Sequence, residues 1–81
     1  MTPEEIRTAF LAALAEVAPE IDPATVPGDA HLQDDLELDS MDILNLVTAL
    51  DRSLGVAIPD AEYREIATPD RAIAYLSARL S

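Results

Sequence analysis

The chain of 81 residues contains no cysteine, no lysine and only three aromatic residues. Without cysteine it can form no disulfide, thiolate metal site or thiol nucleophile, so any thiol chemistry would have to come from an added group. Sixteen acidic residues stand against five arginines, and the net charge of −11 argues against nucleic acid or an anionic membrane as the partner. A basic protein surface is the partner that this charge favours.

Long apolar runs are also missing. The sequence has no stretch of about 18 apolar residues and no signal-peptide pattern, so we expect a soluble, cytoplasmic protein without membrane insertion. A chain of 81 residues buries only roughly 60% of its unfolded surface. That is too little to enclose a large substrate cleft as well as a core, and it speaks against a multi-step enzyme.

The spacing of apolar residues predicts helices separated by proline-containing loops, with no convincing strand. Thr2, Pro3 and Glu5 indicate the first helix start, with Thr2 as the N-cap and Glu5 closing a capping box. Apolar side chains then recur at helical spacing as far as Val17, and Pro19 ends the helix.

A long connection over residues 19–38 follows, and a loop of this length is commonly functional when it is ordered. The strongest helical pattern then runs from Asp39 or Ser40 to Leu54. Gly55 supplies its stop, because glycine readily adopts the left-handed conformation that ends a helix.

Residues 56–60 are too short and too close to a proline for a paired strand, and we expect them to insert Val56 and Ile58 into the core. A short helical piece is expected around residues 60–66. Thr68-Pro69-Asp70 repeats the Thr-Pro start and opens a last amphipathic helix. The sequence thus predicts an all-α fold of three main helices and one short helix.

One stretch, residues 34–42, places a serine inside an acidic cluster at the start of the predicted second helix; it reads Asp-Asp-Leu-Glu-Leu-Asp-Ser-Met-Asp. Free backbone N–H groups and the positive dipole end at a helix N-terminus favour a phosphate attached to Ser40. Asp39 and Asp42 can cap this helix start. Taken alone, Asp39 and Ser40 are typical of an ordinary helix cap.

The stretch resembles the attachment site of the acyl carrier protein family, whose Asp-Ser-Leu motif carries a 4′-phosphopantetheine arm on the serine and stands here as Asp39, Ser40 and Met41. The resemblance covers nearly the whole chain, through Asp35-Leu36, the apolar spacing up to Leu50, Ile58-Pro59-Asp60 and Ile66-Ala67-Thr68. It implies one domain over residues 1–81, a small antiparallel four-helix bundle with a long loop between helices 1 and 2. Two positions depart from the family: Glu37 stands where many members have glycine, and Asn45 where many have a glutamate used in partner docking.

The resemblance implies that Ser40 receives 4′-phosphopantetheine covalently from coenzyme A, and that the arm carries acyl groups as thioesters. The chain would be a non-catalytic carrier and the substrate of a phosphopantetheinyl transferase, since no metal cluster or histidine base is evident near Ser40. The other partners implied are acyl ligases, synthases or acyltransferases with basic docking surfaces, in fatty acid, lipid or polyketide-type biosynthesis. We expect a monomer. Asn45, Arg52 and the missing lysine suggest a specialised carrier with its own dedicated ligase or synthase.

Acidic residues surround the proposed attachment point. Six carboxylates lie between residues 29 and 42 with no arginine among them, and Asp51 continues the run. Such runs are usually solvated faces, but complementary charge here would speed docking with basic partners and still let them leave. The candidate docking residues are Asp34, Asp35, Glu37, Met41, Asp42, Leu44, Asn45 and Asp51. The acids lack the spacing and the glycine of an EF-hand loop, so we expect no metal site.

An acyl chain exposed to water costs about 0.8 kcal/mol per CH₂, so a carrier gains by sheltering its cargo between helices. The candidates for lining such an acyl pocket are Leu44, Val47, Leu50, Ile58 and Ile66. Ordinary core packing explains each of them equally well. His31 is expected to be a loop residue that contacts the surroundings of Ser40 or solvent.

Two alternatives remain open. An aminoacyl or peptidyl carrier domain usually shows glycines and fewer acids before the serine, whereas residues 36–39, Leu-Glu-Leu-Asp, fit the acyl type better. The second alternative is an unmodified acidic helical module that binds a basic protein with the same face. It predicts that Ser40→Ala leaves function intact.

Overall fold

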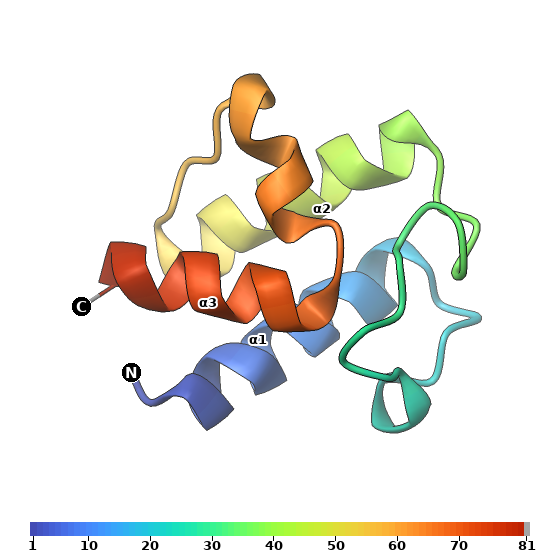
Figure 1. The fold of residues 1–81 in the computed structure, drawn as a ribbon, viewed down its shortest axis with the longest axis horizontal. Helices are drawn as coiled ribbons and strands as arrows, with labels where there is room; N and C mark the ends of the chain where they lie inside the picture. Colours follow the sequence, from blue (N-terminus) through green and yellow to red (C-terminus); the bar gives the residue numbers. More distant parts are fainter. Residues whose placement is uncertain (81) are drawn as a thin grey trace.

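The computed structural model describes residues 1–80, and all the regular structure in this range is helical. Its elements in chain order are α1 (Pro3–Val17), the 3-10 turn η1 (Pro23–Thr25), α2 (Ser40–Leu54), the 3-10 helix η2 (Asp60–Ile66) and α3 (Pro69–Leu80) (Figure 1). The predicted all-α fold, with a long loop between the first two main helices, is therefore confirmed. The sequence pattern missed η1. None of the helices in residues 1–80 has both the length and the apolar character needed to cross a membrane.

Both predicted Thr-Pro helix starts are present. The hydroxyl of Thr2 accepts a hydrogen bond from the N–H of Glu5 at 3.2 Å, and the Glu5 carboxylate accepts one from the N–H of Thr2 at 2.7 Å. At α3 the hydroxyl of Thr68 accepts from the N–H of Arg71 at 3.2 Å. These bonds satisfy N–H groups that have no partner inside the first turn of a helix, so the chain begins a helix at each proline.

The segment between α2 and η2 contributes to the core as expected. Gly55 adopts a left-handed conformation with φ +70° and ends α2, and its N–H donates to the carbonyl of Asp51. Val56 and Ile58 are then buried against the helices. The predicted short helix at residues 60–66 is confirmed, as a 3-10 helix rather than an α-helix.

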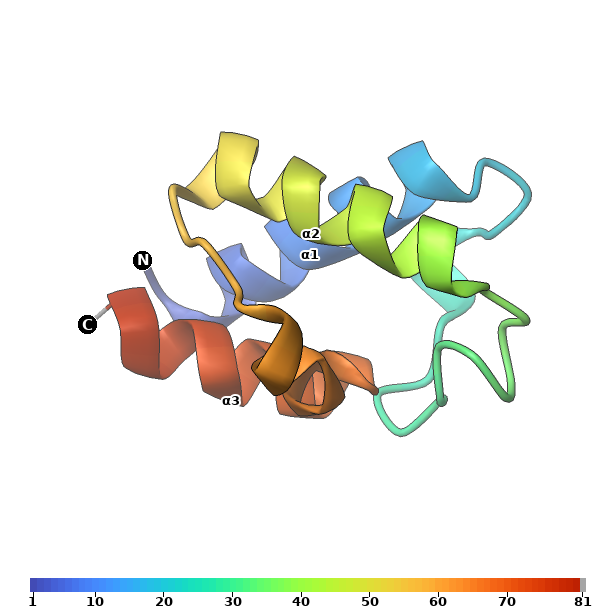
Figure 2. The same ribbon diagram turned by 90° about the horizontal axis from the view of Figure 1, so that it is seen from above.

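Helix α1 supports the rest of the bundle. It packs against both α2 and α3, while η2 packs against α3; in residues 1–80 no Cα atom of α2 lies within 8 Å of one in η2 or α3. Figure 2 shows α2 on one side of the molecule and η2 with α3 on the other. Apolar side chains fill the space between them, and the fully buried ones include Phe10, Leu46, Leu50, Ile66 and Leu76.

Backbone hydrogen bonds fix the long loop to the junction of η2 and α3. The N–H of Leu32 donates to the carbonyl of Ala67 at 2.9 Å, and the N–H of Asp70 donates to the carbonyl of Gly28 at 2.9 Å. Leu32 is fully buried and anchors the middle of the loop in the core. The loop therefore brings residues 28–33 next to the end of η2, although the two segments are far apart in sequence.

Candidate functional site

Ser40 is the first residue of α2, and its side chain is exposed. The N-cap residue Asp39 accepts a hydrogen bond from the N–H of Asp42 at 2.8 Å, and Asp42 accepts one from the N–H of Asp39 at 3.2 Å. This reciprocal capping box confirms the cap expected from the sequence. It fixes the backbone on both sides of Ser40 and directs the serine hydroxyl away from the core.

Two backbone donors beside the serine remain available. The N–H groups of Ser40 and Met41 have no acceptor within residues 1–80. The next two N–H groups of the helix do have acceptors: the N–H of Asp42 donates to Asp39 in the capping box, and that of Ile43 donates to the Asp39 carbonyl at 3.0 Å. Free N–H groups and the helix dipole at this end of α2 favour a negatively charged group such as a phosphate. An exposed hydroxyl with these neighbours fits a phosphate ester.

The approach to the serine contains an unusual backbone conformation. Glu37 has φ +60°, in the left-handed region that favours glycine, and it is the one such non-glycine residue in the described chain. The next residue, Leu38, is buried, and its N–H donates to the carbonyl of Leu32 at 3.0 Å. The left-handed turn at Glu37 lets Leu38 enter the core just before α2 begins. This explains in physical terms why glycine suits position 37.

A cavity of about 300 Å³ opens beside Ser40. It lies where the start of α2, the loop around residues 31–33 and the last turns of η2 meet. Its lining residues are His31, Leu32, Gln33, Ser40, Ile43, Tyr63, Arg64, Ile66 and Ala67. The volume is at the lower end of the range for small-molecule pockets, so the site can hold a short chain.

The cavity differs in part from the predicted acyl pocket. Of the five residues proposed from the sequence, Ile66 is the one that lines it. Val47, Leu50 and Ile58 are buried in the core outside this lining, and Leu44 is 45% exposed. The apolar spacing identified residues that face the core, but it carries no information on which of them border an opening.

Among the other lining residues, sequence reasoning singled out Ser40 and His31 and proposed none of the rest, although local geometry gives a signal for two of those. In a 3-10 helix residues three apart lie one above the other, which places Tyr63 on the same side of η2 as Ile66. In an α-helix residues three apart are neighbours, which places Ile43 beside Ser40. Arg64 and Gln33 had no comparable signal, because their position depends on how the loop meets η2.

His31 borders the same cavity as Ser40, and its ring has a defined hydrogen-bond pattern. The ring nitrogen Nδ1 accepts from the N–H of Gln33 at 3.3 Å and from the N–H of Asp34 at 3.2 Å. A neutral imidazole with an acceptor at Nδ1 carries its proton on Nε2. The carboxylate of Asp35 accepts from the N–H of His31 at 2.7 Å and fixes the turn.

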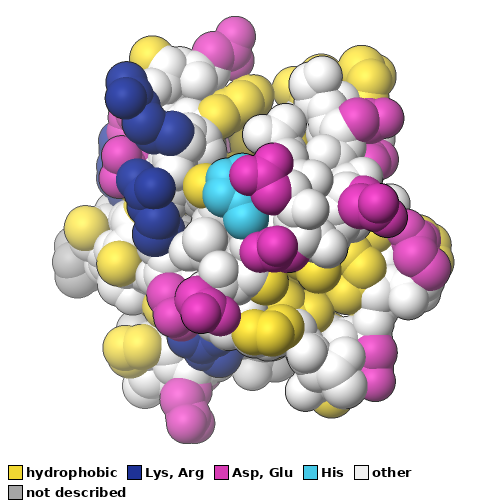
Figure 3. Space-filling model, turned by 45° about the vertical axis from the view of Figure 1, so that its right-hand side comes forward, with side chains coloured by type: hydrophobic (Ala, Val, Ile, Leu, Met, Phe, Trp, Pro, Cys, Tyr) yellow, Lys and Arg dark blue, Asp and Glu magenta, His cyan; other side chains and the backbone are white. Residues whose placement is uncertain are grey.

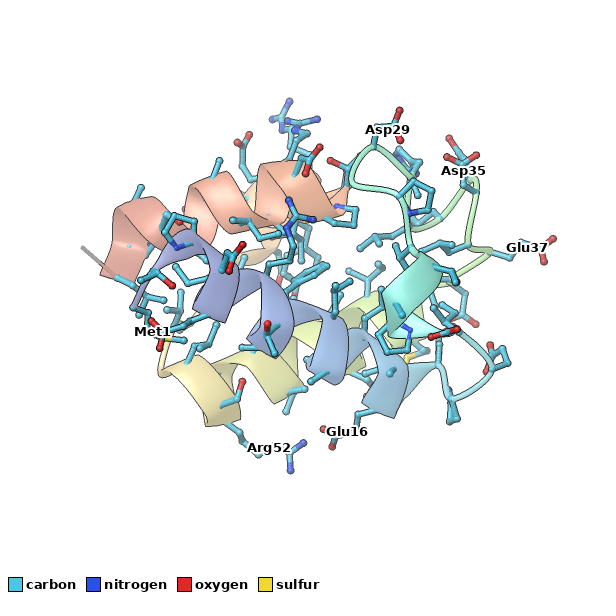
Figure 4. All side chains as sticks on the ribbon, turned by 90° about the horizontal axis from the view of Figure 1, so that it is seen from below. Met1, Glu16, Asp29, Asp35, Glu37 and Arg52 are labelled. Carbon is cyan, nitrogen blue, oxygen red and sulfur yellow. The ribbon has the colours of Figure 1, made fainter. Side chains whose placement is uncertain are left out.

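The candidate docking residues lie at or near the surface of α2 and of the loop before it, with Asp51 in the C-terminal part of α2. Met41 is 62% and Leu44 45% exposed, and both are large apolar side chains. Figure 4 shows Asp35 and Glu37 projecting outward from the loop. On the face in Figure 3 acidic side chains are spread over both sides, and arginine side chains lie mainly on the left. The other candidates are exposed except Asp42, which is half-buried; they are Asp34, Asn45 and Asp51.

Asn45 lies apart from the serine, in a second hollow of about 290 Å³ between α1 and α2. Arg52 borders the same hollow and pairs with Glu16 of α1 at 3.0 Å (Figure 4). This ion pair joins Arg52 of α2 to α1. This face of α2 therefore carries an amide and a paired arginine instead of free carboxylates.

The sequence profile of the family described as "Phosphopantetheine attachment site" matches residues 6–76. This chain belongs to the acyl carrier protein family. It is similar to the acyl carrier protein of Rubrobacter xylanophilus, with 36% identity over 56 residues that cover 69% of each chain. It is also similar to the acyl carrier protein of Renibacterium salmoninarum, with 34% identity over 72 residues that cover 85% of this chain and 89% of the relative.

Members of this family carry a covalently attached 4′-phosphopantetheine. The residues present fit that group, because an exposed serine hydroxyl, free N–H groups and an adjoining cavity lie together at the start of α2. Residues 1–80 contain no cluster of three or more His, Asp or Glu side chains that could hold a metal ion.

Proposed function

We propose that Ser40 is the residue that receives 4′-phosphopantetheine, and that the chain carries acyl groups on this arm as a single domain over residues 1–81. The observation that carries the proposal is the exposed Ser40 hydroxyl at the start of α2, next to two free N–H groups and a cavity. When bound, the arm supplies a terminal thiol, which this chain lacks, and takes the acyl group as a thioester.

In this proposal the chain is a substrate and a carrier, and its partners perform the reactions. The Ser40 hydroxyl makes no hydrogen bond within residues 1–80, so no side chain there acts on it as a general base. A phosphopantetheinyl transferase then has to supply the base and the metal ion for the transfer. The contribution of Asp39 and Asp42 is to hold the helix start that presents the hydroxyl.

The docking surface is proposed to consist of an apolar centre and an acidic surround. Met41 and Leu44 provide exposed apolar area, and the carboxylates around them attract basic surfaces of an acyl ligase, synthase or acyltransferase. The acidic residues are Asp34, Asp35, Glu37, Asp42 and Asp51. Contacts of this kind are strong enough for recognition and weak enough for release, which suits a monomeric cytoplasmic carrier that visits several enzymes.

The face around Asn45 supports the proposal of a specialised carrier. In place of a carboxylate this face has an amide, beside an arginine held by Glu16. A partner that relies on a carboxylate at position 45 would lose one attractive contact. We infer that the partner set within fatty acid, lipid or polyketide-type biosynthesis includes an enzyme dedicated to this chain.

Intact mass tests the proposal directly. The protein is incubated with coenzyme A, magnesium and a broad-specificity phosphopantetheinyl transferase, alongside Ser40→Ala and the control Ser53→Ala, which removes another exposed serine of α2. The parent and the control should each gain the mass of one phosphopantetheine, and Ser40→Ala none. No gain in the folded parent, with a working carrier as positive control, would favour the unmodified acidic binding module.

A further inference from the structure

The cavity beside Ser40 differs in charge from the rest of the molecule. The chain has sixteen acidic residues and five arginines, yet none of the residues that line this cavity is acidic. Arg64 and His31, in contrast, both border it. A cavity bordered by an arginine and by no acidic residue is complementary to an anionic ligand, although the Asp34 carboxylate lies 3.7 Å from His31 Nδ1 on the loop.

Arg64 is also the one arginine without a partner in the described chain. Its guanidinium makes no ion pair or hydrogen bond within residues 1–80, although acidic side chains are abundant. Each of the other four arginines pairs with a carboxylate; the pairs are Arg7 with Asp70, Arg52 with Glu16, Arg71 with Glu65 and Arg79 with Glu62. A guanidinium presents several donors in a fixed plane that matches carboxylate and phosphate oxygens.

His31 adds a second donor to the same cavity. Its Nδ1 accepts from the backbone N–H groups of residues 33 and 34, so the neutral ring has its N–H at Nε2. The ring borders the cavity. A guanidinium and an imidazole N–H that border the same cavity are two donors for the oxygens of an anion bound there.

We propose that the cavity beside Ser40 is an anion-binding site in which Arg64 is the cationic residue and His31 a second donor. The ligand is an anionic oxygen group carried on the Ser40 arm, so the inference rests on the proposed function. Two groups supply this chemistry: the phosphodiester that joins the arm to the serine, and a carboxylate at the far end of an acyl cargo. A carrier that binds either one holds its arm against η2 instead of leaving it free in solvent.

The test compares four forms of the full chain by NMR: apo, holo with a free thiol, butyryl-loaded and succinyl-loaded. The two acyl groups have four carbons each and differ in ending on a methyl group or a carboxylate. The readout is solvent exchange of the arginine Nε–H groups, with Arg71 as the matched exposed arginine outside the cavity. If the phosphodiester is the ligand, exchange at Arg64 slows by about two- to fivefold from apo to holo, as for an exposed ion pair. If the carboxylate is the ligand, exchange slows in the succinyl form and not in the butyryl form.

Variants provide the second readout. Arg64→Gln should shift the ³¹P resonance of the holo form if the phosphodiester is the ligand, or speed hydroxylamine cleavage of the succinyl but not the butyryl thioester if the carboxylate is. Arg71→Gln should change neither the ³¹P resonance nor the rate of thioester cleavage. Circular dichroism confirms that both variants are folded. Unchanged exchange at Arg64 in all four forms, or an equal change at Arg71, would overturn the anion site. Failure of the proposed function would be seen earlier and separately, as the absence of any phosphopantetheine mass gain.

Discussion

The guanidinium of Arg7 donates a hydrogen bond to the carboxylate of Asp70 at 2.7 Å, and this ion pair joins α1 to the first turn of α3. The same carboxylate lies against Gly28 of the long loop, where a Cβ atom would lie 2.4 Å from its Oδ1. The N–H of Asp70 also donates to the carbonyl of Gly28. Asp70 is therefore the point at which α1, α3 and the loop that leads to the serine meet.

Gly28→Ala should separate the ion pair without unfolding the protein. The new Cβ displaces the Asp70 carboxylate from Arg7, whereas in an Asp70→Ala background it meets no such group. Alanine also lowers the entropy of the unfolded chain, which favours folding by roughly 0.4–1 kcal/mol. We expect Gly28→Ala to stabilise the Asp70→Ala protein and to be neutral or destabilising in the parent, as measured by urea unfolding. Equal effects in both backgrounds would contradict the contact.

Glu37, the left-handed residue three positions before Ser40, is a position where a substitution should stabilise the protein. A non-glycine residue at φ +60° costs about 1 kcal/mol, and the exposed Glu37 side chain contributes no core packing that would be lost on replacement. Glu37→Asn should raise the free energy of unfolding by about 0.5 kcal/mol, because asparagine tolerates this conformation. Glu37→Val should lower it by about 1 kcal/mol or more. Chemical denaturation of the three proteins checks the order, and a parent more stable than the asparagine variant would refute it.

The cap at the start of α2 should matter for stability as well as for presenting the serine. Asp39→Ala removes the acceptor for the Asp42 N–H and should lower the free energy of unfolding by about 1 kcal/mol. Asp39→Asn keeps an acceptor oxygen and should retain most of the parent's free energy of unfolding. Asp51→Ala removes an exposed carboxylate of the same helix that accepts no cap bond, and thermal unfolding should place it within about 0.5 kcal/mol of the parent.

The cap of α1 predicts a pH dependence. The hydrogen bond from the backbone N–H of Thr2, aided by the Thr2 hydroxyl, lowers the pKa of Glu5 below its ordinary value. A carboxyl with a lowered folded-state pKa stabilises the fold above the unfolded-state pKa, and this contribution is lost as the pH falls through the folded-state pKa. The stability difference between the parent and Glu5→Gln, from urea midpoints, should therefore favour the parent at pH 7 and shrink below pH of about 4. A difference that does not change with pH would contradict this assignment.

Alanine substitutions at Leu44 and Leu46 of α2 should distinguish an effect on partner docking from an effect on stability. Leu46 is fully buried, and Leu46→Ala should cost about 2–5 kcal/mol in unfolding free energy. Leu44 is 45% exposed, so Leu44→Ala should leave stability within about 0.5 kcal/mol while lowering kcat/KM for the transferase. Unchanged kinetics in the alanine variant at position 44 would remove this leucine from the docking surface.

Local patterns in the sequence were sufficient for the helix starts and ends. The capping boxes Thr2 to Glu5 and Asp39 to Asp42 each join residues three apart, so the sequence itself contains both partners. Gly55 likewise acts through its own backbone conformation. Such features depend on neighbours in the chain, and a single sequence is enough to find them.

The residues that line the cavity beside Ser40 could not be predicted from local sequence patterns. Its wall combines His31 of the loop with Arg64 of η2, and what brings them together is a hydrogen bond between Leu32 and Ala67. No periodic pattern encodes that bond. The apolar spacing therefore pointed to Leu50 and other core residues, and it gave no signal for Arg64 or Gln33 at the opening.

The position of α2, whose backbone approaches that of α1 but neither η2 nor α3, has a mechanical consequence. In residues 1–80 no backbone hydrogen bond joins α2 to η2 or α3, and buried apolar side chains from these elements belong to one core. Because no backbone hydrogen bond crosses this space, α2 can move away from η2 and α3 without breaking one, while its packing against α1 is retained.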